Sequence, residues 1–99
     1  MTAPSEQLDG FLHAIADPTR RRILHALKEK GKDSLGRDAG LCASEIEQWV
    51  SLAQPTVSHH MKILEKAHLV VTTRDGHWRR YRRNEKLIRE MMKHMRGQL

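Results

Sequence analysis

Apolar residues near both ends of the chain recur with the spacing of amphipathic helices. In residues 6–16 and 85–97 they fall three or four positions apart, which places them on one face of a helix. Asn84 stands where it can cap the second of these helices. The apolar residues of the two stripes are Leu8, Phe11, Leu12 and Ile15, and then Leu87, Ile88, Met91, Met92 and Met95.

Three further helices are predicted between these two. Asp17 and Pro18 form an N-cap followed by proline at the first helical position, so a helix begins there and runs to about Lys30. A short helix over 44–50, a turn over 51–53 and a longer helix from Gln54 follow. The residues that we expect to face the core are Ile23, Leu24 and Leu27, then Ile46, Trp49 and Val50, then Val57, Met61 and Leu64.

The pattern changes from that of a helix to that of two strands at residues 69–83. β-Branched and aromatic residues flank the dipeptide Asp75-Gly76, which predicts a type I′ hairpin with these two residues at the centre of the turn. Alternation along the second strand puts Trp78 and Arg80 on one face, and Arg79 and Tyr81 on the other. We expect Tyr81 to pack on the core and Trp78 to cover the hairpin.

The order of these elements predicts a winged helix-turn-helix. A short helix, a tight turn and an amphipathic helix over 43–67 form the helix-turn-helix, and the hairpin over 69–83 that follows is a wing. The predicted fold class is therefore mostly α with a small β-hairpin, in a single domain over 1–99. The chain has only four aromatic residues, so its core must consist mainly of aliphatic and methionine side chains.

The charge of the chain favours a polyanionic partner. Eighteen Lys and Arg residues stand against twelve Asp and Glu residues, and nine of the basic but only three of the acidic residues follow residue 73. A basic domain of this size indicates nucleic acid first and an anionic membrane second. No signal segment and no apolar run of about 20 residues are present, and the single cysteine forms no internal disulfide. We expect a cytoplasmic protein with no membrane partner.

Hydrogen-bonding side chains open the helix that starts at Gln54. A recognition helix places its N-terminal residues near base edges in the major groove, where Gln, Ser, Thr and His can read them. Arginines on the hairpin would supply phosphate contacts, and a narrow minor groove attracts inserted arginine. The candidate DNA-binding residues are Gln54, Thr56, Ser58, His59, His60 and Lys62 on the helix, and Arg74, His77, Arg79, Arg80 and Arg82 on the hairpin.

Three consecutive arginines, residues 20–22, occupy the first turn of the helix that begins at Pro18. The positive end of the helix dipole makes this placement unfavourable. Two interpretations are open at this point: a phosphate lies nearby, or the three side chains are solvated.

Three blocks of the sequence resemble the ArsR/SmtB family of bacterial winged-helix repressors. They are ADPTRRRIL (16–24), AQPTVSHHMKILEKAHLV (53–70) and RDGHWRRYRRN (74–84), and the resemblance covers nearly the whole chain. It implies a homodimer that binds an imperfect inverted repeat and represses transcription until an inducer lowers its DNA affinity. It also implies that the first and last helices form the dimer interface, through Leu8, Phe11, Leu12, Ile15, Leu87, Ile88, Met91, Met92 and Met95.

The chain departs from the family pattern at both ends of the recognition helix. Ser51 and Ala53 replace the Gly and Ser that are common in the turn, so we expect a weak N-cap. His68 stands where the family usually has a C-terminal glycine, so we expect a non-glycine residue in the left-handed conformation.

The effector site of metal-sensing members is incomplete. Their Cys-Val-Cys motif falls on LCASEI (41–46), where Cys42 matches the first cysteine and Ser44 replaces the second. The last helix offers only Glu90 and His94 of the family's zinc-binding set. The adjacent His59 and His60 lie about 100° apart around a helix and cannot chelate one ion together. We expect no metal site and no cofactor, with Cys42 as the only candidate ligand.

Several functional interpretations remain at the level of the sequence. The leading one is a homodimeric, sequence-specific repressor released by an unidentified small-molecule or redox inducer, and we hypothesise that the unusually long loop 31–40 is where this signal acts. The alternatives are a metal- or thiol-responsive repressor that senses through Cys42, a non-specific basic DNA-binding protein, and a protein-interaction module that uses the methionine-rich last helix. No nucleophile–base pair, carboxylate pair or phosphate-binding glycine loop has a usable spacing, so an enzyme is not expected.

Overall fold

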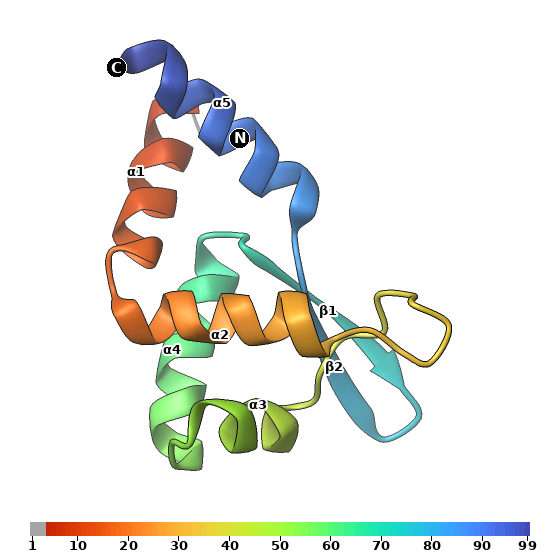
Figure 1. Ribbon diagram of the computed structural model, residues 1–99. Coiled ribbons are helices and arrows are strands. Elements are labelled where there is room, and N and C mark those ends of the chain that lie inside the picture. The colour runs from red at the N-terminus through yellow and green to blue at the C-terminus, as the bar shows by residue number, and fades with distance from the viewer. Residues whose placement is uncertain (1–3) are drawn as a thin grey trace.

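The computed structural model describes residues 4–99, which form five helices and one two-stranded antiparallel sheet (Figure 1). The predicted order of elements and the mostly α fold class are confirmed. The elements are α1 (Pro4–Ile15), α2 (Pro18–Lys30), α3 (Ala43–Val50), α4 (Gln54–Lys66), β1 (Val70–Asp75), β2 (Trp78–Arg83) and α5 (Glu85–Gln98).

Side-chain caps start α2 and α5 where the sequence predicts them. The Asp17 carboxylate accepts hydrogen bonds from the backbone N–H groups of Thr19 at 2.7 Å and Arg20 at 3.2 Å. The Asn84 side-chain oxygen accepts one from the N–H of Leu87 at 3.2 Å. These bonds satisfy N–H groups that have no partner inside the helix. By contrast, Ala53 at the start of α4 makes no side-chain cap, as expected for this departure from the family pattern.

Two non-glycine residues in the left-handed conformation stand at the ends of the helix-turn-helix elements. Ser51 follows α3 with φ of 56°, and His68 follows α4 with φ of 60°. The prediction for His68 is therefore confirmed. This conformation is disfavoured for residues with a Cβ atom. It lets the chain reverse direction sharply, so that α4 is followed at once by β1.

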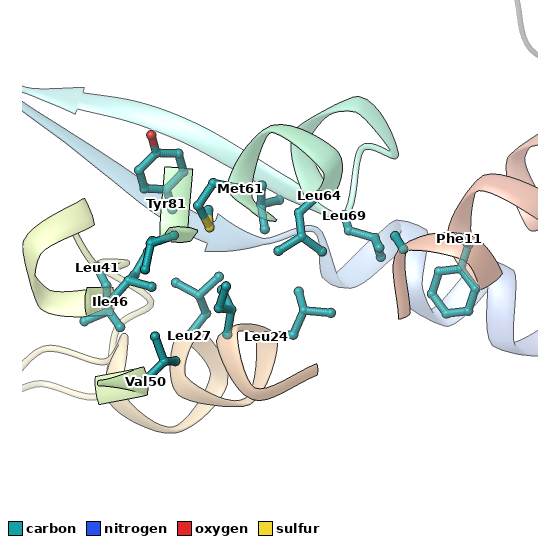
Figure 2. Packing of buried hydrophobic residues seen from close by; sticks show 14 of the residues in the cluster. Phe11, Leu24, Leu27, Leu41, Ile46, Val50, Met61, Leu64, Leu69 and Tyr81 are labelled. Carbon is teal, nitrogen blue, oxygen red and sulfur yellow. The ribbon is translucent and has the colours of Figure 1, made fainter. Parts of the chain in front are cut away.

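The hydrophobic core lies where α2, α3, α4 and the base of the hairpin meet (Figure 2). The buried residues include every core position predicted for α2 and α4, together with Tyr81 from β2. A second contact joins α1 to α5 at one end of the molecule, where Phe11 is buried (Figures 1 and 2). The buried members of the cluster are Leu8, Phe11, Ala14, Ile23, Leu24, Leu27, Leu41, Ile46, Val50, Val57, Met61, Leu64, Leu69, Val70, Tyr81 and Met91.

Both tryptophans lie largely at the surface, which contradicts the position predicted for Trp49. Trp49 was expected on the apolar face of its helix with Ile46 and Val50, but it is 52% exposed and carries the Lys30 ammonium 4.5 Å from its ring centre. The helix is short, and only two of its apolar residues fit against α2 and α4. Trp78, at the end of the hairpin, is 59% exposed, and its role in covering the hairpin stays a prediction.

The turn of the hairpin is shifted by one residue from the prediction. Asp75 pairs with Trp78 in the sheet, so the two central residues are Gly76 and His77 rather than Asp75 and Gly76. Gly76 has φ of 62°, whereas Ser51 and His68 are the only non-glycine residues with positive φ in the described part of the chain. A positive φ at the first central residue alone, supplied by glycine, is the pattern of a type II′ turn and not of type I′.

The loop between α2 and α3 is tied to the outer edge of β2. Leu41 and Tyr81 exchange two backbone hydrogen bonds, of 3.0 and 2.8 Å. Gly40 makes this approach feasible, because a Cβ atom there would lie 2.6 Å from the Tyr81 carbonyl oxygen and its φ is +80°. The loop itself is closed by a bridge between Lys32 and Asp38. The base of the wing is thus three-stranded at one position.

Candidate nucleic-acid interface

Helix α4 has one buried apolar face, and its polar side chains occupy the rest of the helix surface. Because Val57, Met61 and Leu64 are buried against the rest of the domain, the remaining positions face outward or sideways. Among the DNA-binding candidates of this helix, four are exposed, namely Gln54, Thr56, His59 and Lys62. The other two, Ser58 and His60, are half-buried.

One side of α4 faces the wing across a cleft. Gln54, Ser58 and Lys62 share this side, and together with Arg79 and Tyr81 they line a cleft with a volume of about 230 Å³. Three of the predicted helix residues and one of the predicted wing arginines therefore meet at the same place.

A carboxylate in the same cleft was not among the predicted residues. Glu65 forms an ion pair of 3.8 Å with the Arg79 guanidinium, whose carbon lies 5.7 Å from the ring centre of Tyr81. The helical period could have indicated it, since Glu65 is seven residues after Ser58 and lies on the same face. The ion pair orients Arg79 and also competes with any phosphate for it.

Arg74 and Arg79 stand directly opposite each other in the hairpin. Like charges at such a position destabilise a sheet, because the side chains are close together. Within residues 4–99, no carboxylate lies within 4 Å of Arg74. A polyanion at the end of the wing would relieve this repulsion.

Arg80 and Arg82 project from the opposite face of β2. Arg80 is held between two carboxylates, with Asp75 at 3.4 Å and Glu45 of α3 at 3.7 Å. The side chain of Arg82 passes close to Gly40, because a Cβ atom there would lie 2.8 Å from the Arg82 Cγ. These two candidates therefore lie beside the 31–41 segment and away from the cleft that contains Arg79.

The solvated interpretation of the three arginines of α2 is wrong for Arg20 and holds for Arg21 and Arg22, which are exposed. Arg20 is buried, and its guanidinium donates to the carbonyl oxygens of His13 and Ala14. Arg21 donates to the carbonyl of Ile15 at 2.6 Å, and Arg22 to that of Val50 at 2.7 Å. All four acceptors lie in the last turns of α1 and α3, where carbonyl groups lack helical partners. The arginines therefore cap the C-terminal ends of neighbouring helices.

The two adjacent histidines of α4 differ in their surroundings. His59 is exposed, whereas His60 is half-buried and its Nδ1 atom lies 3.3 Å from the Arg20 Nη1 atom. Their rings lie edge to face, with centres 5.4 Å apart. One ring nitrogen of His60 is thus engaged inside the domain.

Cys42 occupies the N-cap position of α3. Its backbone N–H donates to Glu45 at 2.9 Å, and its Sγ lies 3.2 Å from the hydroxyl of Ser44. The backbone bond from Cys42, the Cys42 side chain and the charge of Arg80 together hold the pKa of Glu45 below its usual value, although partial burial opposes them. Within residues 4–99, no three or more His, Cys, Asp or Glu side chains are grouped so that they could hold a metal ion.

The residues predicted for a dimer interface fall into two groups. Leu8, Phe11 and Met91 are already buried inside a single chain, which the sequence did not lead us to expect for such a small domain. Leu12 and Met92 remain 37% and 46% exposed on α1 and α5. Ile15, Leu87, Ile88 and Met95 are partly buried beside them. Fewer of the predicted interface residues are thus available to contact a partner chain than the sequence led us to expect.

No helix in the described part of the chain is both long and apolar enough to span a membrane.

Known proteins of similar sequence are transcription regulators. Residues 15–73 match a family model described as a helix-turn-helix domain. The chain is 35% identical to the HTH-type transcriptional regulator MJ1325 of Methanocaldococcus jannaschii, over 89% of this chain and 90% of that protein. It is 31% identical to the transcriptional repressor SdpR of Bacillus subtilis, over 89% and 88% of the two chains.

Solved structures of similar fold have been determined for winged-helix regulators. An ArsR family transcriptional regulator, RHA00566, matches with a TM-score of 0.74 and 26% identity, over 99% of this chain and 92% of the other. The homodimeric winged helix-turn-helix DNA-binding domain of Mb0332 from Mycobacterium bovis matches with a TM-score of 0.71 and 21% identity, over 91% and 76%, and so bears on the fold alone. From the matched helix-turn-helix domain, the repressor relatives and the shared fold, it follows that this chain belongs to the ArsR family of winged helix-turn-helix transcriptional regulators.

Proposed function

We propose that the protein is a sequence-specific repressor that binds double-stranded DNA as a homodimer at an inverted repeat and is released by a signal. The observation that carries this proposal is the cleft in which Gln54, Ser58 and Lys62 of α4 meet Arg79 of the wing. A base-reading helix and a phosphate-binding hairpin that share one surface can engage the same stretch of duplex.

Sequence reading falls to the exposed N-terminal half of α4 in this proposal. Gln54 can form two hydrogen bonds with adenine, while Thr56, Ser58 and His59 accept a wider range of base edges. Lys62, one turn further on, is placed for a phosphate. The ends of the hairpin, with Arg74, His77 and Arg79, supply most of the sequence-independent affinity.

Dimerisation falls to the apolar surface that α1 and α5 leave open. Leu12 and Met92 are exposed there, next to partly buried methionine and isoleucine side chains. A two-fold axis through these helices would present two copies of α4 to the DNA, and half-sites one helical turn apart are what such dimers recognise. The homodimeric state of the similar Mb0332 domain supports this arrangement.

The releasing signal is not assigned to Cys42. A soft-metal site needs two or more thiolate or imidazole ligands that converge on the ion, and this region offers one thiol beside a serine hydroxyl. A thiol-responsive mechanism would need a second cysteine from another chain, or oxidation of the single thiol.

Fluorescence anisotropy with the DNA upstream of the protein's own gene, against a shuffled duplex of equal length, tests the proposal. A specific repressor should prefer its site by about 10³-fold or more at physiological salt. Repeating the measurement at several salt concentrations separates phosphate contacts from base contacts, because phosphate contacts weaken with salt on both duplexes. Equal affinity for both duplexes, and for tiled fragments of the neighbouring genes, would instead identify a non-specific DNA-coating protein.

A further inference from the structure

Arg20 is a buried cation, 7% exposed, at the junction of α1, α2 and α4. Its Nε donates to the carbonyl of Ala14 at 2.6 Å, and its Nη2 donates to that of His13 at 3.1 Å. Both carbonyls belong to the last turn of α1, where the negative end of the helix dipole favours a positive charge. Two edges of the guanidinium are therefore fixed to α1.

The remaining nitrogen of Arg20 faces two groups. Its Nη1 lies 3.3 Å from the Nδ1 of His60 on α4 and 3.8 Å from the carboxylate of Asp17. A single buried side chain therefore joins the end of α1 to the recognition helix. A cation in this position must be fully paired, because an uncompensated buried charge is strongly unfavourable.

The chemistry of the two side chains determines which form of His60 can take part. Arginine can only donate hydrogen bonds, so the Nδ1 of His60 must be the acceptor and must carry no proton. A neutral imidazole then carries its proton on Nε2. A protonated imidazole has N–H groups on both nitrogens, so it would meet the guanidinium donor to donor and charge to charge. The contact can exist only while His60 is neutral.

The charged groups around His60 come from two elements. From α2 these are Arg20 and Asp17, and from α4 itself the neighbouring ring of His59. Helix α1 contributes backbone carbonyls to Arg20. The Asp17 carboxylate accepts two backbone hydrogen bonds and faces Arg20.

We propose that Arg20 and His60 form a positioning link between α1 and the recognition helix, which is made only by neutral His60 and whose loss on protonation of His60 weakens DNA binding. This inference rests on the proposed DNA-binding function, because DNA affinity is its readout. It gives His60 a different role from the base contact expected from the sequence. His60 orients α4, and His59, Ser58 and Gln54 remain free to read bases.

The link matters because α1 belongs to the proposed dimer surface. A fixed distance from α1 to α4 holds the two recognition helices of a dimer at one spacing, which has to match the spacing of the half-sites. When the link opens, the position of α4 relative to α1 is no longer fixed. DNA binding must then restore that position, and the free-energy cost of doing so lowers DNA affinity.

The test compares His60→Asn with the matched control His25→Asn, because His25 is an exposed histidine of α2 outside the proposed DNA contacts. An asparagine places an acceptor near the former Nδ1 position but does not titrate. DNA affinity is measured by anisotropy between pH 8 and pH 5.5 at constant ionic strength, across the range in which histidine changes charge. Wild type and His25→Asn should lose about ten- to a hundredfold more affinity on acidification than His60→Asn does, which corresponds to the loss of one hydrogen bond to a charged group. Parallel profiles for wild type and His60→Asn would overturn the proposal.

A second measurement needs no DNA. Nitrogen-15 NMR of the histidine rings at pH 8 should find His60 with its proton on Nε2 and a bare Nδ1. A proton on Nδ1 would overturn the link, whatever the DNA data are. Absence of site preference at pH 8, with the Nε2 form present, would instead contradict the proposed function and leave the link intact.

Discussion

Consecutive arginines at a helix start can cap the ends of two neighbouring helices. Successive side chains leave a helix about 100° apart, so residues 20–22 point in three directions. Arg20 enters the core, Arg21 reaches the end of α1 and Arg22 reaches the end of α3. Each guanidinium meets carbonyl groups at the negative end of another helix, and this compensates for its unfavourable position in α2. The three arginines therefore have a structural role, because they bind the carbonyl groups at the ends of neighbouring helices.

Replacement of Gln54 tests the base-reading role at this scale. Gln54→Ala should lower affinity for the specific site by about 1–3 kcal/mol, because a two-bond contact to one base is lost. Competition binding with duplexes that carry each single base change shows where discrimination is lost. It should be lost at one base step only.

Gln48→Ala provides the comparison for Gln54. Gln48 is an exposed glutamine on α3 and is not among the candidate contacts, so its replacement should leave the profile unchanged. If Gln54→Ala weakened random and specific DNA by the same factor, α4 would not be reading bases through this residue.

At the element scale, α3 depends on a reciprocal cap at its first turn. Glu45 accepts the backbone N–H of Cys42, and this bond is the largest cause of its lowered pKa. A carboxyl whose pKa is lower in the folded than in the unfolded state stabilises the fold above its unfolded pKa, here near 4.5. That contribution disappears as the pH falls through the folded value.

Glu45→Gln should therefore destabilise the protein at pH 7 and have little effect near pH 3. The amide keeps an acceptor for Cys42 but loses the charge, so the expected loss is below about 1 kcal/mol for this half-exposed group. Urea unfolding at both pH values measures it. Glu47→Gln, in the same helix but outside the cap, is the control. A deficit that persisted unchanged at pH 3 would show that the charge of Glu45 is not the cause.

A substitution in the wing tests for a phosphate contact, which is independent of the DNA sequence. Arg79→Ala should weaken binding to specific and random duplexes alike and reduce the salt slope by about 0.9, the value for one lost phosphate contact. Arg37→Ala removes an exposed arginine that is paired with Asp33 in the 31–40 loop, and it should leave the slope unchanged. An unchanged slope for Arg79→Ala would mean that Glu65 keeps this side chain off the DNA.

The helices could be predicted because apolar spacing and caps depend only on residues that are close together in the sequence. The hairpin turn was misplaced for a physical reason. The predicted and observed pairings leave Val70 and Tyr81 on the same face, so burial alone does not distinguish between them. Apart from the nearby Asp17, the partners of Arg20 could not be predicted, since His60 lies forty residues away and the other acceptors are backbone carbonyls. Only the assembled junction identifies them.

At the scale of the whole molecule, α1 and α5 form a pair at one end, and the helix-turn-helix and wing form the other part (Figure 1). The direct route from α1 to the rest runs through α2, including the buried Arg20. An assembly surface and a DNA-reading surface are thus separate but mechanically joined.

Charge placed on the α1–α5 surface should prevent dimerisation without unfolding the domain. In the double variant Leu12→Glu, Met92→Glu, both introduced carboxylates are at exposed positions, and burying them at an interface would be strongly unfavourable. Light scattering should give the mass of one chain, and DNA affinity should fall. Leu35→Glu, at an exposed leucine of the 31–40 loop, should leave both unchanged. A dimer that survived in the double variant would place the interface elsewhere.

The bridge between Leu41 and Tyr81 divides the wing into two dynamic regions. At the base, the amides of Leu41, Tyr81 and Asn84 are all hydrogen-bonded between segments, so they should exchange with solvent only when the domain opens. Beyond Tyr81 no third strand of residues 4–99 pairs with the hairpin, so its amides should exchange far sooner. The end of the wing can then bend to follow the curvature of a duplex while its base keeps a constant angle to α4.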